Sequence, residues 1–322
     1  MADLRALLSA SILLLAFSVA NAASPAISLF PLPKGTSPES IAIDSSGQIY
    51  FADPRANRIV GFSPANSSFQ TFAIPTRDAR PSDLINGPDS LLTFTETHGG
   101  KIGRLDPTSG VIYEYPTPDG ADDPAMVALG PVGTVFFTCP LGNLIGALDP
   151  TSGQFSLFAI PTPRSNPYAI SLGPLDSLFF SEPKASKIAR FDLSTHSIEE
   201  FTTPTPDSQP LRLACKGPLV FFTEYQSGKL GRLSPSDRTF KEWASPGGPS
   251  SHPEAIVIDN DGVVWYCESS RGVLIRFNPS DESFSQVALP KGVSYVHSMK
   301  VAPDGRIWMV LGGINALSVL KP

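Results

Sequence analysis

The sequence predicts an all-β protein: a seven-bladed β-propeller whose blades are four-stranded antiparallel sheets. The first observation is a repeat, since the prolines that open one short motif fall at 38, 81, 124, 167, 210 and 253, each 43 residues after the last. A second motif, seen as "GRLDP", "GALDP" and "GRLSP", ends at intervals of 42–44 residues. The third observation is that no window sustains a helical period over the roughly ten residues that a helix needs.

Each repeat predicts four strands in the same order. In the fourth repeat they fall at residues 168–172 ("YAISL"), 177–182 ("SLFFSE"), 187–192 ("KIARFD") and 198–201 ("IEEF"). These runs are rich in β-branched and aromatic residues, and the segments between them carry turn-forming residues. One such unit cannot bury both faces of its sheet, so seven units arranged around an axis form a propeller.

The two ends of the chain predict how the ring closes. The seventh repeat ends at Pro322 without a fourth strand, and "AISLFPLP" at 26–33 has the form of the missing one. We therefore expect the N-terminal strand to pair into the last blade. Residues 23–322 then make a single domain and, we expect, a monomer.

The first 22 residues have the pattern of a secretory signal peptide. Arg5 precedes an apolar run over 6–20, and Ala20-Asn21-Ala22 supplies the small residues that signal peptidase prefers. We expect a secreted protein that is free of the membrane after cleavage; an uncleaved N-terminal anchor is the alternative. In that setting the sequon at Asn66 predicts N-glycosylation.

Composition excludes several partners. The formal net charge is −6 and no cluster of Lys or Arg is present, so nucleic acids and anionic membranes are poor candidates. Three cysteines are too few for a disulfide framework in an exported chain.

One column of the repeat is acidic in five blades. We expect these side chains to be structural, accepting hydrogen bonds from turn or neighbouring-blade backbone, although a ring of metal ligands is the alternative. The third blade has a cysteine here, which we expect to be packed rather than nucleophilic. The column reads Asp53, Glu96, Cys139, Glu182, Glu224, Glu268 and Leu311.

The column directly after the repeated proline does not repeat, which marks it as a candidate site. It begins the innermost strand of each blade, where seven strands converge on the axis. It reads Glu39, Ser82, Ala125, Tyr168, Leu211, Glu254 and His297. The residues before the proline should form the rim: Ser37, Arg80, Asp123, Asn166, Gln209, His252 and Tyr295.

Ring closure makes blades 6, 7 and 1 neighbours and predicts an acid–base cluster. A carboxylate bonded to an imidazole raises its basicity, so Glu254 or Glu39 could make His297 a general base. A solvated channel mouth with no catalytic role is the plain alternative. Apolar, aromatic and polar residues near this cluster are expected to bind the substrate: Tyr168, Tyr295, His252, Ser82, Leu211 and Met126.

The phrase "LLTFTETHGGKIGRLDPTSGVIYEYPTP" at 91–118 resembles the streptogramin B lyase (virginiamycin B lyase) family, and the resemblance extends over nearly the whole chain after residue 22. In that family a last-blade histidine is the base of an elimination that opens a depsipeptide lactone, assisted by magnesium. The resemblance places His297 at that base. It also implies that two acids near the magnesium are replaced here by Tyr295 and Gly312, and that a histidine and a tyrosine are replaced by Glu254 and Glu39.

These observations predict an exported enzyme of secondary metabolism that acts on a mid-sized, largely apolar natural product. With the family's metal acids missing, we expect no cofactor, and a cyclisation, including the Diels–Alder type, or an elimination, with His297 as base or hydrogen-bond donor. One alternative is a non-catalytic propeller that binds a ligand or partner. The other is a metal-dependent lyase or lactonase, with magnesium or calcium held by a rebuilt set of oxygen ligands.

Overall fold

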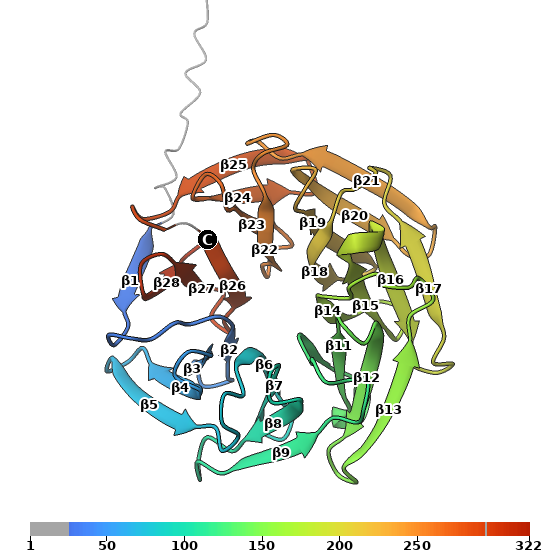
Figure 1. Ribbon diagram of the computed structural model, residues 1–322. Helices are drawn as coiled ribbons and strands as arrows, with labels where there is room; N and C mark the ends of the chain where they lie inside the picture. The colour runs from blue at the N-terminus through green and yellow to red at the C-terminus, as the bar shows by residue number, and fades with distance from the viewer. Residues whose placement is uncertain (1–25, 294) are drawn as a thin grey trace, which may run out of the picture.

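The computed structural model describes residues 26–293 and 295–322, and these residues form seven four-stranded antiparallel sheets arranged around a central axis (Figure 1). The predicted seven-bladed propeller is therefore confirmed. The predicted signal peptide at 1–22 lies outside the described residues. In the described part no helix is long and apolar enough to cross a membrane.

Each blade runs from its innermost strand outward. Blade 1 holds β2 (Ile41–Ile43), β3 (Ile49–Asp53), β4 (Arg58–Ser63) and β5 (Ser68–Ala73). Blade 2 holds β6 (Pro81–Asn86), β7 (Leu92–Glu96), β8 (Lys101–Leu105) and β9 (Ile112–Pro116). Blade 3 holds β10 (Val127–Leu129), β11 (Val135–Cys139), β12 (Leu144–Asp149) and β13 (Gln154–Ala159), with a 3-10 turn η1 (Pro131–Gly133). Blade 4 holds β14 (Ile170–Gly173), β15 (Ser177–Glu182), β16 (Lys187–Asp192) and β17 (Ile198–Thr202), with η2 (Pro183–Ala185).

The remaining blades follow the same order. Blade 5 holds β18 (Pro210–Lys216), β19 (Leu219–Glu224), β20 (Lys229–Ser234) and β21 (Thr239–Ala244). Blade 6 holds β22 (Pro253–Ile258), β23 (Val264–Glu268), β24 (Val273–Asn278) and β25 (Ser283–Ala288). Blade 7 holds β26 (Tyr295–Val301), β27 (Ile307–Gly312) and β28 (Ala316–Leu320), and its fourth strand is β1 (Ile27–Pro31).

The hydrophobic core lies between neighbouring blades. Every residue of β7, β11, β15 and β23 is buried, whereas the outermost strands are partly exposed. One core cluster packs Phe221 of blade 5 against Tyr266 and Phe277 of blade 6. Because each blade completes its core on the next one, ring closure gives the first and last blades the neighbour that they would otherwise lack.

The N-terminal strand closes the ring, as predicted. It pairs antiparallel with β28 from Ile27 opposite Leu320 to Pro31 opposite Ala316. The ring of Phe30 lies 5.1 Å from that of Trp308 in blade 7 and 5.3 Å from that of Phe62 in blade 1. The closing strand therefore belongs to blade 7 and also packs on blade 1.

Two members of the acidic column accept backbone hydrogen bonds, as predicted. Asp53 accepts the Ser37 N–H at 3.0 Å, and Glu268 accepts the Gly247 N–H at 2.8 Å. Each acid also pairs with an arginine on the next strand of its own blade or the turn before it. These acids anchor the loop that enters the innermost strand.

For Glu96 and Glu182 the predicted hydrogen bonds are wrong. Both side chains are fully buried, and neither carboxyl has a hydrogen-bond partner among the described residues. Burial raises the pKa of Glu96 to about 8 and that of Glu182 to about 7. Glu224 is intermediate, since one of its oxygens accepts the Ser227 hydroxyl and the other is unpartnered.

The cysteines form no disulfide, and the predicted packing of Cys139 is confirmed. Cys139, Cys215 and Cys267 are all free thiols. Cys139 is fully buried, and burial raises the pKa of its thiol, which makes it a packed residue rather than a nucleophile. Asn66 is exposed in the turn between β4 and β5.

Candidate functional site

A β-bulge places His297 at the start of the innermost strand of blade 7. Val296 pairs with Leu311 and Ser298 pairs with Val310, so His297 is an extra residue in β26. A bulge leaves its extra residue out of the ladder and re-aims the side chains beside it. The seventh repeat lacks the proline here, and Val296 is fully buried in its place.

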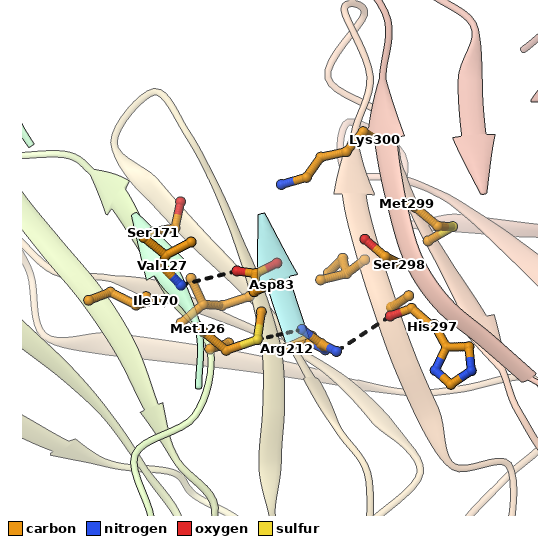
Figure 2. Close-up of a pocket in the computed structure, with 14 residues that line it drawn as sticks. Asp83, Met126, Val127, Ile170, Ser171, Arg212, His297, Ser298, Met299 and Lys300 are labelled. Carbon is orange, nitrogen blue, oxygen red and sulfur yellow. Dashed lines mark hydrogen bonds between the residues drawn. The ribbon is translucent and has the colours of Figure 1, made fainter. Parts of the chain in front are cut away.

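Blades 2, 5 and 6 show the same register shift just after the proline. In these three blades two consecutive residues leave the ladder, whereas in blade 7 only His297 does. The residue two places after the proline position lines an axial cavity of about 110 Å³ (Figure 2). In six blades this residue is Asp83, Met126, Ala169, Arg212, Ala255 or Ser298.

A wider hollow of about 440 Å³ opens at the mouth over blades 5, 6 and 7. Aromatic rings build its walls: Tyr225 stacks on His252 with centroids 4.7 Å apart, and Tyr295 meets His297 edge-on at 4.3 Å. Of the predicted acid–base cluster, Glu254 and His297 lie here together with the predicted binding residues His252 and Tyr295, and Glu39 is not among the lining residues. The hollow is lined by Tyr225, His252, Glu254, Ser269, Ser270, Tyr295 and His297.

The predicted pairing of His297 with a carboxylate is wrong. The Glu254 carboxylate accepts the Ser269 hydroxyl at 2.6 Å, and in the described part of the chain the His297 imidazole makes no hydrogen bond. Burial and, to a smaller extent, the positive charge of Arg212 together lower the pKa of His297 to about 4. The imidazole is therefore neutral at physiological pH, and its basicity is reduced rather than raised.

Arg212 is the residue that the sequence analysis missed. It reaches the axis from β18, and its guanidinium lies 3.4 Å from the His297 carbonyl oxygen (Figure 2), 3.4 Å from the Tyr168 hydroxyl and 3.3 Å from the Met126 sulfur. It also lies over the Tyr168 ring, 4.9 Å from the centroid. The one signal in the sequence is that a basic residue in this second column is confined to blade 5.

The other predicted binding residues divide into two groups. Tyr168 and Met126 contact Arg212. The Ser82 hydroxyl instead donates to the Ala125 carbonyl at 2.8 Å, and Leu211 is not among the described residues that line either cavity. Burial raises the pKa of Glu39, although Arg212 opposes that shift.

The donor set at the mouth does not fit the magnesium site that the resemblance implied. Tyr295 and Gly312, the positions of the two expected acids, pair directly across β26 and β27. The Tyr295 ring fills the space over Gly312 so closely that a Cβ atom there would overlap it. Among the described residues no three His, Cys, Asp or Glu side chains are grouped to hold a metal ion.

The fold and this site define a class: seven-bladed β-propellers with a hollow at the axial mouth. The chain belongs to the Virginiamycin B lyase family, whose model matches residues 25–320. No curated protein sequence matches the chain.

Solved structures agree. A streptogramin B lyase structure aligns with a TM-score of 0.86 and 26% identity over 92% of this chain and 98% of its own. A selenomethionine-substituted virginiamycin B lyase from Staphylococcus aureus aligns with a TM-score of 0.85 and 26% identity, over 92% of this chain and 99% of its own. A catalytically inactive histidine-to-alanine variant of that enzyme, solved with quinupristin, aligns at 0.85 and 25% over the same shares.

Proposed function

We propose that this protein is an exported enzyme that takes a mid-sized, largely apolar natural product into the mouth over blades 5, 6 and 7 and transforms it without a metal. The single observation that carries the proposal is the placement of His297. It is the extra residue of a β-bulge, and it lines both the mouth and the axial cavity. Its imidazole makes no hydrogen bond to other described residues.

Cyclisation suits this geometry best. A general base works best with a pKa near the operating pH, and the pKa of His297 is about 4. A neutral imidazole beside a permanent cation instead orients and polarises a substrate through hydrogen bonds. Holding two reacting parts of one molecule together lowers the barrier to ring closure by several kcal/mol, on the order of 7 or more in favourable cases.

A metal-free elimination is the second candidate, and the family match favours it. The relatives are named as lyases, and one was solved with quinupristin. In this reaction the neutral His297 takes a proton from carbon, the electron pair forms a C=C bond, and the C–O bond to the leaving oxygen breaks.

The test compares wild type with His297→Ala and His297→Gln, with EDTA present, on quinupristin and on metabolite extracts of the producing organism. We expect turnover by the wild type and a loss of about a hundredfold or more in His297→Ala. The exposed histidine variant His98→Ala is the control, since His98 lies outside both cavities.

Isotope labelling separates the two reactions on a deuterated substrate. Cyclisation of the Diels–Alder type keeps every deuterium, whereas elimination loses one to solvent and shows a primary kinetic isotope effect. Turnover that requires added magnesium and stops with EDTA would contradict the proposal, as would tight binding of a metabolite without any product.

A further inference from the structure

The guanidinium of Arg212 has donors to spare. Arginine carries five N–H donors, and three contacts of Arg212 run to a sulfur, a hydroxyl and a carbonyl at 3.3–3.4 Å. The two contacts to oxygen, each 3.4 Å, exceed the 2.7–3.2 Å or so of a normal N–H···O bond, and the thioether sulfur is only a weak acceptor. Its Nε atom is buried without any partner, and among the described residues no carboxylate forms an ion pair with it.

This unused capacity faces the axial cavity, which Arg212 lines together with Asp83 and Lys300 (Figure 2). The cavity volume of about 110 Å³ is too small for a mid-sized ligand. It equals the liquid volume of a few water molecules, at roughly 30 Å³ each. It therefore suits one polar group of a ligand whose body lies in the mouth.

The charges around Arg212 indicate whether the polar group of the ligand is neutral or anionic. The carboxyls of Glu39, Asp83 and Glu254 all interact electrostatically with Arg212. Asp83 is itself satisfied, since it accepts the Ser40 hydroxyl at 2.6 Å and the Val127 N–H at 3.0 Å. Three carboxyls already act on Arg212, so another anion would meet repulsion, whereas a neutral oxygen acceptor would not.

We infer that Arg212 is a substrate-binding residue that donates hydrogen bonds to a neutral carbonyl oxygen (ester, amide or ketone) of the natural product, placed in the axial cavity below the mouth. The inference rests on the proposed binding of that product at the mouth. In a cyclisation the hydrogen bonds polarise the carbonyl and its conjugated bond, and in an elimination they stabilise the enolate oxygen.

The test is a binding measurement with three probes that share one aromatic skeleton: cinnamamide, cinnamate and β-methylstyrene. Their phenyl ring suits the aromatic mouth, and they differ in carrying a neutral carbonyl, a carboxylate or neither. Dissociation constants are measured for wild type, Arg212→Met and Arg212→Lys. The matched control is Arg238→Gln, which removes an arginine paired with Glu199 on the outer surface.

We expect cinnamamide to bind the wild type best and to lose about ten- to a hundredfold in Arg212→Met, as for a bond to a charged donor. Arg212→Lys keeps the charge without the planar fork and should lose less; it also carries the test if Arg212→Met does not fold. In Arg212→Met the NMR titration midpoint of His297 should rise, because the cation that lowers it is gone.

Equal cinnamamide affinity in wild type and Arg212→Met, or no binding of cinnamamide at all, would overturn the inference. Tighter binding of cinnamate than of cinnamamide would overturn the choice of a neutral group. Carbonyl binding in a protein that shows no turnover would retain this inference and defeat only the catalytic proposal, so the two failures can be told apart.

Discussion

At the scale of single residues, the geometry of the site depends on side-chain contacts that are not repeated from blade to blade. Tyr295 can pack flat against its partner strand because Gly312 lacks a side chain, and that ring in turn supports the edge of His297. Arg212 comes from a blade two places away and sets the charge beside the same imidazole. The surroundings of His297 are therefore set by residues that lie 2, 15 and 85 positions away in the sequence.

The pair Tyr295 and Gly312 gives a double-mutant test. Gly312→Ala alone should destabilise the fold by about 1–3 kcal/mol, because its Cβ overlaps the tyrosine ring. In a Tyr295→Ala background the same change should cost less than about 0.5 kcal/mol. Urea unfolding of the four proteins measures the coupling. Equal costs in both backgrounds would show that the ring does not fill this space.

At the scale of elements, the closing strand β1 contributes side-chain packing as well as the hydrogen bonds of its pairing with β28. Its side chains alternate, so that Leu29 is 43% exposed while Phe30 packs on Phe62 and Trp308. The Leu32 N–H also donates to the Asn315 carbonyl at 3.0 Å, which holds the chain beyond the strand.

Phe30→Ala should therefore lower stability by about 2–4 kcal/mol, since it removes a ring at the joint of blades 7 and 1. Leu29→Ala, one residue earlier on the solvent face, is the matched control and should cost less than about 1 kcal/mol. Thermal unfolding of both variants checks this. Similar losses in the two would mean that β1 stabilises the ring through its backbone alone.

Most of these elements could be predicted from sequence, and the axial site only partly. Turn residues at a 43-residue spacing are local features, so they predict the strands, their order and the closure by residues 26–33. The bulge after the proline is a feature of strand pairing, and spacing alone does not show it. For that reason the repeat spacing predicts the column of His297 but not the next column, which holds Arg212.

At the scale of the whole molecule, the acidic column makes stability depend on pH. Glu96 and Glu182 are fully buried without hydrogen-bond partners, with pKa values raised from 4.5 to about 8 and about 7. The folded state therefore favours the protonated acids. Their contribution to stability is complete below about pH 4.5 and is lost as the pH rises through 7 and 8.

Replacing both by glutamine should remove this dependence. Between pH 5 and pH 8.5 we expect the free energy of unfolding to fall by on the order of 1–3 kcal/mol more in the wild type than in the Glu96→Gln/Glu182→Gln variant. Urea unfolding at the two pH values measures the difference. Asp53→Asn is a contrasting variant, since the Asp53 carboxylate accepts the Ser37 N–H and forms an ion pair with Arg58. If the double variant loses as much unfolding free energy as the wild type, Glu96 and Glu182 do not cause the pH dependence, and their carboxyls must have hydrogen-bond donors.

The pairing of β1 with β28 also sets the order in which the protein can be completed. Residues 27–31 are synthesised before any blade exists, yet their partners at 316–320 form the last strand. Domains otherwise fold from the N-terminus as the chain emerges, but here the first strand must wait for nearly the whole chain. A chain cut short before Ala316 lacks the partner of β1 and leaves the ring open between blades 7 and 1, so closure requires residues 316–320.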